Sequence, residues 1–277
     1  MLDCLTVSNP HLSCGQLSAV LRNPLDCIDS KLTSPTFNAM VLKALLLDFN
    51  GIVIKDTGLK ERLIDDILLS ENLRPNPEEY CEMCAERSDR ACLDRLLSRR
   101  GRVTTPEFLN QLLAKLTDGY VQQLADLPRL PIYPGLADLL YQAKVASLPV
   151  AMVTSTSRQE VDWVLEQAQL SDNFAVTVTA ADVSVEEEKP APRGYEIAIA
   201  QLNEQFPELA LTPHNCLAIE AWYPGIAAAK QAGIPVVGVA HCHPYRMIQR
   251  RANWVVDYLN EIDFDWIGSA YQPASAA

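Results

Sequence analysis

The sequence predicts an α/β fold, with a Rossmann-like parallel sheet core and an inserted all-helical cap domain. Six short, nearly continuous apolar runs predict the strands, at residues 41–47, 149–155, 174–179, 215–220, 235–240 and 254–259. Runs of this kind are typical of strands that are buried on both faces. Segments with helical spacing separate them, as in Leu136, Leu139, Leu140 and Ala143. Strands that alternate with helices build parallel sheets through right-handed crossovers.

The domain organisation follows from one long interruption of this alternation. Residues 54–130 contain four helical patterns without a strand pattern, and they leave and rejoin the core beside the first strand. We therefore expect residues 54–130 to form a helical cap that can lie over a site as a lid. The core is then formed by residues 40–53 and 131–263. Residues 1–39 are expected to be a poorly ordered leader, and residues 264–277 a C-terminal tail.

Net charge and the distribution of apolar residues limit the kinds of ligand that the protein can bind and its location in the cell. The formal net charge of −12 argues against a nucleic-acid or anionic-membrane surface, because phosphate backbones select clustered Lys and Arg. The sequence contains no apolar run long enough to span a bilayer. The N-terminus lacks the basic and apolar regions of a secretory signal. We expect a cytoplasmic protein that acts on a small ligand.

The eight cysteines are expected to stay reduced, because the chain shows no secretory signal. Cys81 and Cys84 have the spacing of a zinc-ligand pair, and a second cluster of ligand types is formed by His241, Cys242 and His243. However, Cys81 and Cys84 fall within a helical pattern, and a second C-x-x-C pair is missing from the sequence. The sequence therefore favours a helix over a zinc site.

Three polar side chains stand at the ends of predicted strands. They are Asp48, Thr154 and Glu220. The carboxyl ends of parallel strands form the edge at which such sheets bind ligands, so we expect these side chains to converge. Asp48 is placed to act as a carboxylate nucleophile, although an aspartate in this position can also be a turn residue. Gly51 permits a sharp turn that brings the backbone close to a ligand.

Four segments occur along the chain in order: Asp48-Phe49-Asn50-Gly51-Ile52, Val153-Thr154-Ser155, Lys189-Pro190-Ala191-Pro192 and Ile219-Glu220-Ala221. In these segments the chain resembles the haloacid dehalogenase (HAD) superfamily, specifically its β-phosphoglucomutase-like and phosphoglycolate phosphatase-like members with a helical cap. The resemblance covers roughly residues 41–261. It implies phosphoryl transfer through an aspartyl phosphate, with Mg²⁺ as cofactor and a small phosphorylated metabolite as partner.

The resemblance also implies a role for each segment. Asp48 is the nucleophile, and Lys189 neutralises charge on the nucleophile and on the phosphoryl group. The residues implied to contact substrate are Thr154, Ser155 and Gly51, and those implied to bind the metal are Asp48, Asn50 through its backbone carbonyl, and Glu220. Without the resemblance, Thr154 would belong to a helix N-cap cluster and Lys189 would be a surface lysine.

Two departures from the family pattern bear on catalysis. Asn50 stands where the family has an aspartate that serves as general acid and base, and an amide has no titratable proton near neutral pH. Losing a positioned acid or base typically costs about 10²–10⁴ in rate. Ala221 stands where the family has an aspartate that binds Mg²⁺ directly. Because a methyl group supplies no ligand, we expect Mg²⁺ binding to be weak or lost.

Two functions stay open. The first is a hydrolase that acts on a small phosphate ester, of phosphatase or sugar-phosphate mutase type, with an impaired or altered acid/base and metal site. The second is a catalytically degenerate protein of this fold with a binding or regulatory role and a protein partner. Dehalogenation is disfavoured, because Ala221 leaves the last segment without an aspartate. In the cap, Arg87 and Arg90 are candidates to hold a second phosphate, or they belong to a solvated helix face.

Overall fold

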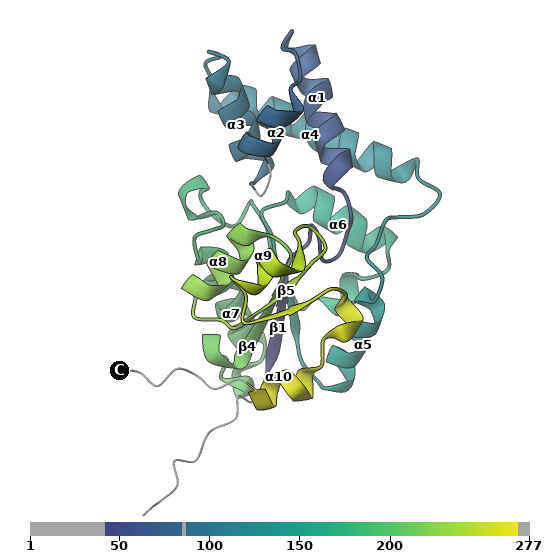
Figure 1. The fold of residues 1–277 in the computed structure, drawn as a ribbon, viewed down its shortest axis with the longest axis vertical. Helices are drawn as coiled ribbons and strands as arrows, with labels where there is room; N and C mark the ends of the chain where they lie inside the picture. The colour runs from purple at the N-terminus through teal and green to yellow at the C-terminus, as the bar shows by residue number, and fades with distance from the viewer. Residues whose placement is uncertain (1–41, 85–86, 271–277) are drawn as a thin grey trace, which may run out of the picture. The chain divides into compact units, whose positions relative to one another are not determined.

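The computed structural model describes residues 42–84 and 87–270. Its centre is a six-stranded, wholly parallel sheet in the order β3-β2-β1-β4-β5-β6 (Figure 1). The strands are β1 (Ala44–Leu47), β2 (Val150–Val153), β3 (Val176–Val178), β4 (Cys216–Glu220), β5 (Val236–Val239) and β6 (Trp254–Val256). Each strand lies within one of the six apolar runs, and the predicted α/β class with a Rossmann-like parallel sheet is confirmed.

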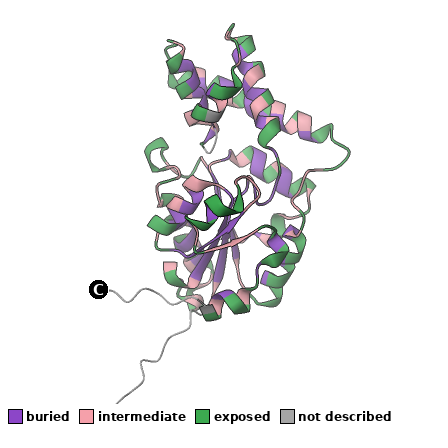
Figure 2. Cartoon of the chain, viewed as in Figure 1, coloured by how far each residue is buried: buried purple, intermediate pink, exposed green. Residues whose placement is uncertain are grey.

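Two hydrophobic clusters cover the two faces of the sheet. On β1, Leu45 and Leu47 belong to one cluster and Ala44 and Leu46 to the other, as expected of a strand buried on both faces. The first cluster includes side chains of α5 (Leu136–Val145), α6 (Arg158–Gln167) and α10 (Phe264–Ala270). The second includes side chains of α7 (Arg193–Gln205), α8 (Tyr223–Gln231) and α9 (Tyr245–Gln249). Figure 2 shows the central strands as buried and the outer sides of these helices as exposed.

Four further helices lie between β1 and α5 in the chain. They are α1 (Thr57–Ser70), α2 (Pro77–Met83), α3 (Asp89–Arg99) and α4 (Pro106–Ala125). Three of them begin at a side chain that accepts a backbone N–H, namely Asn76, Ser88 and Thr105. Helices α1 and α4 pack closely, since a Cβ at Gly119 would lie 2.8 Å from Leu63 Cδ2. All four helices fall within residues 54–130, the segment predicted to form the cap.

Part of the segment expected to be a tail is helical. Helix α10 begins at Phe264, and its Ile267 is buried in the first cluster, so the core extends beyond residue 263. The leader expected at residues 1–39 lies outside the described residues, as do residues 271–277. Short 3₁₀ helices span Ser171–Asn173, Val185–Glu187, Pro207–Leu209, Pro213–Asn215 and Leu259–Glu261. Within the described ranges, every helix is too short or too polar to cross a membrane.

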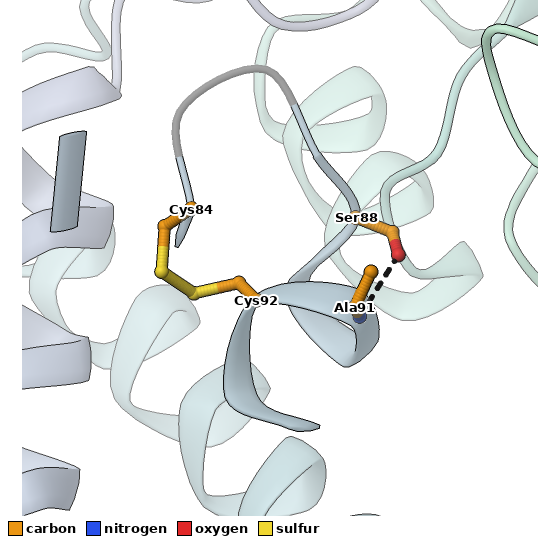
Figure 3. The surroundings of a disulfide bond; sticks show 4 residues. All are labelled: Cys84, Ser88, Ala91 and Cys92. Atoms are coloured by element: carbon orange, nitrogen blue, oxygen red, sulfur yellow. Dashed lines mark hydrogen bonds between the residues drawn. A yellow bond between two sulfur atoms is a disulfide. The ribbon is translucent and has the colours of Figure 1, made fainter. Parts of the chain in front are cut away.

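A disulfide bond joins the end of α2 to α3. Cys84 directly follows α2 and pairs with Cys92 in α3, with the two Cα atoms 4.4 Å apart (Figure 3). Between them, Ser88 accepts a hydrogen bond from the backbone N–H of Ala91 at 3.2 Å and so fixes the start of α3. The expectation that all cysteines stay reduced is therefore wrong for this pair. A separation of eight residues does not reveal that the end of α2 lies beside α3.

We expect the double variant Cys84→Ser/Cys92→Ser to have a free energy of unfolding about 2–3 kcal/mol lower than the native chain. A crosslink that closes a loop of this size restricts the unfolded chain by about that amount. Urea unfolding followed by circular dichroism measures the difference. The native chain treated with a dithiol reductant should show the same loss. Equal unfolding midpoints for the variant and the oxidised native chain would contradict the expectation.

Candidate active site

Asp48, Lys189 and Glu220 form an ion-paired cluster at the carboxyl ends of β1 and β4. Lys189 Nζ donates to Asp48 Oδ1 at 3.0 Å, to Glu220 Oε1 at 2.6 Å and to the Val153 carbonyl oxygen at 2.8 Å. Tyr195 OH also donates to Glu220 Oε1, at 2.5 Å. Glu220 is fully buried, Asp48 is nearly so, and the side chain of Lys189 is 12% exposed. The structure thus brings together three residues that lie far apart along the chain.

Burial and charge shift the titration of this cluster. Burial, supported by the nearby Asp48 charge, raises the pKa of Glu220 to about 8, although Lys189 opposes the shift. Burial alone would lower the pKa of Lys189, but Asp48 and Glu220 raise it above its ordinary value. Burial also raises the pKa of Tyr195 well above its usual range. Lys189 is therefore a fixed cation at neutral pH, held in contact with Asp48.

The segment after β2 lies at the same edge of the sheet. Thr154, Ser155 and Thr156 line one cavity together with Asp48. The Thr154 hydroxyl accepts a hydrogen bond from the Thr156 backbone N–H at 3.2 Å, which fixes the turn. Gly51 has a φ of +84°, so it makes the sharp turn after β1 that the sequence predicts. Gly51 does not line the cavity, so the structure gives it a place in the turn rather than at a ligand.

Asn50 links two polar side chains from different parts of the chain. Its Nδ2 donates to Asp56 Oδ2 at 2.7 Å, and its Oδ1 accepts from Thr156 Oγ1 at 2.5 Å. Tyr120 OH donates to the same oxygen of Asp56 at 2.8 Å. These bonds fix the orientation of the Asn50 amide. An aspartate at position 50 would place a second carboxylate beside Asp56, so the residue types at these two positions depend on each other.

Asp56 is buried at the start of α1. Burial raises the pKa of this carboxyl from 3.8 to about 6, although Lys60, Tyr120 and Asn50 all oppose the shift. A raised pKa means that the folded protein holds this proton more tightly than the unfolded chain does.

We expect Asp56 to make the protein less stable as the pH rises from about 4 to about 6. In this window the folded state binds more protons than the unfolded state, so the free energy of unfolding falls by about 3 kcal/mol for a shift of this size. The variant Asp56→Asn is neutral at every pH and should lose this part of the dependence. Urea unfolding of both proteins between about pH 4 and about pH 7 measures the two slopes. Parallel slopes would contradict the expectation.

A cavity of about 120 Å³ lies beside Asp48. The core contributes residues that include Asp48, Asn50, Ser155 and Lys189, and helices α1 and α2 contribute Ile64 and Tyr80. Arg87, which precedes α3, also lines this cavity. Arg90 does not, because its Nη2 donates to Asn110 Oδ1 on α4 at 2.5 Å. Of the two arginines proposed from sequence to hold a second phosphate, the structure brings Arg87 to the cavity and directs Arg90 away from it.

Lys60 is a second buried cation at this cavity. Its Nζ lies 2.7 Å from Asp89 Oδ2 and 2.5 Å from Glu160 Oε2, and 4.5 Å from the centroid of the Tyr120 ring. Glu160 is fully buried and also accepts from Thr117 Oγ1 at 2.9 Å. Burial alone would lower the pKa of Lys60, but Asp89 and Glu160 raise it. Lys60 therefore ties α1 to both α3 and α6.

Two of the three oxygen ligands that the family resemblance implies for Mg²⁺, those of Asn50 and Glu220, are engaged by other groups. The Asn50 carbonyl oxygen accepts from Trp222 Nε1 at 3.1 Å, and Glu220 Oε1 is bound by Lys189 and Tyr195. Position 221 carries a methyl group. Among the residues that the structure describes, no group of three His, Cys, Asp or Glu side chains is arranged to hold a metal ion. Because Mg²⁺ requires octahedral oxygen coordination, these residues do not fit the cation.

Several residues of this site were not identified from sequence patterns. They are Asp56, Lys60, Thr156, Glu160 and Trp222. The position of Trp222 in the sequence could have indicated it, since this residue directly follows Glu220 and Ala221. For Glu160 the available signal was misleading, because a glutamate in the first turn of a helix is normally solvated. Its burial depends on Lys60, which lies 100 residues earlier in the chain.

The fold and the Asp48–Lys189–Glu220 cluster define a class of hydrolase. The family model for haloacid dehalogenase-like hydrolases matches residues 42–233, and the chain belongs to this family.

Individual relatives agree with this assignment. The chain is 27% identical over 203 residues to protein CbbY of Rhodobacter capsulatus, which covers 72% of this chain and 85% of the relative. It is 31% identical over 145 residues to validoxylamine A 7'-phosphate phosphatase of Streptomyces hygroscopicus subsp. limoneus, covering 52% of this chain and 63% of that protein. A crystal structure of β-phosphoglucomutase from Clostridium difficile matches with a TM-score of 0.68 at 22% identity, covering 82% of this chain and 95% of the other, which shows a shared fold.

Proposed function

We propose that this protein acts on a small phosphate ester through a phosphorylated Asp48, either as a phosphatase, which passes the phosphoryl group to water, or as an enzyme of sugar-phosphate mutase type, which passes it to a sugar hydroxyl. The observation that carries the proposal is the contact of 3.0 Å between Asp48 and the cation Lys189, at the edge of a cavity of about 120 Å³. Membership of the hydrolase family supports the same chemistry, as does the similarity to a phosphatase of a phosphorylated small molecule.

The proposed reaction has two steps. An Asp48 carboxylate oxygen attacks phosphorus, the ester bond between phosphorus and the alcohol oxygen breaks, and the leaving alcohol takes up a proton. Water then attacks phosphorus of the aspartyl phosphate and gives up a proton, which releases inorganic phosphate and restores the carboxylate. Lys189 would hold the negative charge on the phosphoryl oxygens, and the hydroxyl of Thr154 and the backbone N–H of Ser155 would orient them.

Proton transfer is the step at which we expect this chain to depart from its family. Asn50 cannot give or take a proton, and its amide is bound on both sides, by Thr156 and Asp56. The leaving alcohol then exchanges its proton with water, and turnover is about 10²–10⁴ slower than with a positioned acid. Esters with good leaving groups, which need little protonation, should therefore be the better substrates.

A binding or regulatory role is the second candidate function, and Asn50 and Ala221 favour it. One removes the positioned acid and base, and the other removes a metal ligand of the family pattern. In that case the cavity would still bind a phosphorylated metabolite, and the signal would pass to a protein partner without turnover. A cytoplasmic location is proposed for both functions.

Two assays distinguish an enzyme from a binding protein. The first follows the release of p-nitrophenol from p-nitrophenyl phosphate, in EDTA and in Mg²⁺, and the second tests a panel of small sugar phosphates. We expect slow turnover that disappears in Asp48→Asn. The matched control Asp138→Asn, an exposed residue on α5, should retain the activity. Turnover that persists in Asp48→Asn would contradict the proposal. Binding of a sugar phosphate without any turnover would favour the second candidate.

A paired substitution tests whether the missing acid limits the rate. Asn50→Asp alone would set a new carboxylate against Asp56, at the 2.7 Å contact that the amide now makes. The pair Asn50→Asp/Asp56→Asn restores an acid and keeps a hydrogen bond between the two positions. We expect the pair to be faster than the native chain and the single variant to be slower than the pair. Equal rates for all three proteins would contradict a limiting proton transfer.

A further inference from the structure

We infer that Trp222 takes the place of a divalent cation in this site: its indole N–H holds the Asn50 carbonyl oxygen, and Lys189 supplies the positive charge. Trp222 is thus a positioning residue for a site that works without a metal ion. The inference rests on the proposed function for its chemical setting, but its test does not require turnover.

Trp222 is fixed between the cavity and the turn after β1. It is the residue before α8, and it lines the cavity beside Asp48. Its Nε1 donates to the Asn50 carbonyl oxygen at 3.1 Å. The His243 ring packs edge-on against the indole, with ring centroids 5.3 Å apart. An indole N–H is a donor only, so it satisfies a carbonyl oxygen as a cation would, without needing carboxylate ligands of its own.

The turn that carries Asn50 also contacts His241, Ala221 and Trp222, none of which is a carboxylate. His241 Nδ1 lies 2.7 Å from the Gly51 carbonyl oxygen, and the His241 ring stacks on Tyr133 at a centroid distance of 4.0 Å. A Cβ built on Gly51 would lie 2.8 Å from the Ala221 methyl and 3.1 Å from Trp222 Nε1. The turn therefore packs directly on Ala221 and Trp222, which fill the space beside the Asn50 carbonyl.

The remaining implied ligand is turned away from the cavity. Glu220 does not line the cavity, and its Oε1 is held by Lys189. Its Oε2 is buried against α8, where a Cβ on Gly225 would lie 2.1 Å away, and it has no hydrogen-bond partner among the described residues. Of the three implied ligands, only Asp48 brings a carboxylate to the cavity, and Lys189 already contacts it. Lys189, the lysine of the family pattern, is then the cation that remains to balance Asp48 and Glu220.

Binding of Mn²⁺, followed by the electron paramagnetic resonance signal of the free ion, tests the inference on the full chain. We expect the native chain to leave the signal unchanged at Mn²⁺ concentrations above that of the protein. Trp222→Phe removes the N–H and frees the carbonyl, and Trp222→Phe/Ala221→Asp also restores a carboxylate. We expect the pair to bind Mn²⁺ at least tenfold more tightly than the native chain. Trp266→Phe, at an exposed tryptophan of α10, is the matched control and should not bind.

A second measurement covers the case in which Ala221→Asp does not fold, since Ala221 is fully buried. The affinity of the native chain for inorganic phosphate, measured by calorimetry, should be the same in EDTA and in Mg²⁺. Mn²⁺ binding by the native chain that disappears in Asp48→Asn would overturn the inference, as would a tenfold gain in phosphate affinity with Mg²⁺. A chain without turnover that binds no Mn²⁺ would remove the proposed function and leave this inference standing. Turnover that requires Mg²⁺ would overturn this inference and support the proposed function.

Discussion

Replacing Lys189 with methionine is expected to lower the free energy of unfolding by about 3–5 kcal/mol at neutral pH. Methionine keeps the length of the side chain but leaves Asp48 and Glu220 buried without their cation, and an uncompensated buried charge typically costs this much. Without the cation, Glu220, whose pKa burial already raises to about 8, takes up a proton more readily in the folded state, because Lys189 no longer opposes that shift. Above about pH 8 the variant holds a proton on Glu220 that the native chain has released, so the loss should be greater at about pH 9 than at about pH 7. Urea unfolding at several pH values measures both effects.

A control variant and a double variant test whether the loss of stability comes from the charge of Lys189. Lys144→Met, at an exposed lysine of α5, should change the free energy of unfolding by less than about 0.5 kcal/mol. In Lys189→Met/Glu220→Gln the amide cannot ionise, so at about pH 9 the pair should be more stable than Lys189→Met alone. A loss below about 1 kcal/mol in Lys189→Met, or a loss that does not depend on pH, would show that the cluster is not held by its charges.

Lys60→Met is also expected to lower the free energy of unfolding by about 3–5 kcal/mol, because it too leaves a buried carboxylate without its cation. Lys60 lies 2.5 Å from Glu160 and 2.7 Å from Asp89, and Glu160 is fully buried. Removing the ammonium group leaves Glu160 with Thr117 as its remaining hydrogen-bond donor on α4. Because the three charged residues lie on α1, α3 and α6, the variant should also loosen these helices. Hydrogen exchange of α1 and α3 amides measures that change.

The matched control for this variant is Lys115→Met, at an exposed lysine of α4, which should unfold like the native chain. A double-mutant cycle of Lys60→Met with Glu160→Gln isolates the interaction between these two residues. We expect a coupling energy above about 1 kcal/mol. Additive effects of the two substitutions would contradict the direct ion pair.

The sheet could be predicted from sequence because each strand is a short apolar run buried on both faces. Leu45, Leu46 and Leu47 give no period-two alternation, and their burial in two different clusters explains why. Helix α10 was missed because its buried face is small and depends on Ile267. The disulfide was missed because a separation of eight residues does not show that Cys84, at the end of α2, lies beside Cys92 in α3. Contacts of this kind depend on loop geometry, which apolar periodicity does not encode.

The sequence could predict site residues that stand at the ends of strands. It could not predict hydrogen bonds between side chains that only the folded chain brings together. Asp48 and Glu220 were found because parallel strands bring their carboxyl ends to one edge. The substitution Asn50 could be noticed from sequence, but its hydrogen bond to Asp56 could not, because it follows from the position of two side chains across a tight turn. The same holds for Trp222, whose indole N–H reaches a carbonyl oxygen 172 residues away in sequence.

The central claim is that Asp48 is a nucleophile without a positioned proton-transfer partner, and phosphorylation of that residue tests it most directly. The full chain is incubated with acetyl phosphate in EDTA, quenched in acid and mapped by peptide mass spectrometry. Acetyl phosphate has a good leaving group, so the first step needs no acid, whereas hydrolysis of the intermediate is slow without a base at position 50. We predict a phosphoryl group on Asp48 that accumulates, and that is absent from Asp48→Asn. An unmodified Asp48 in a chain that still releases phosphate from p-nitrophenyl phosphate would contradict the account.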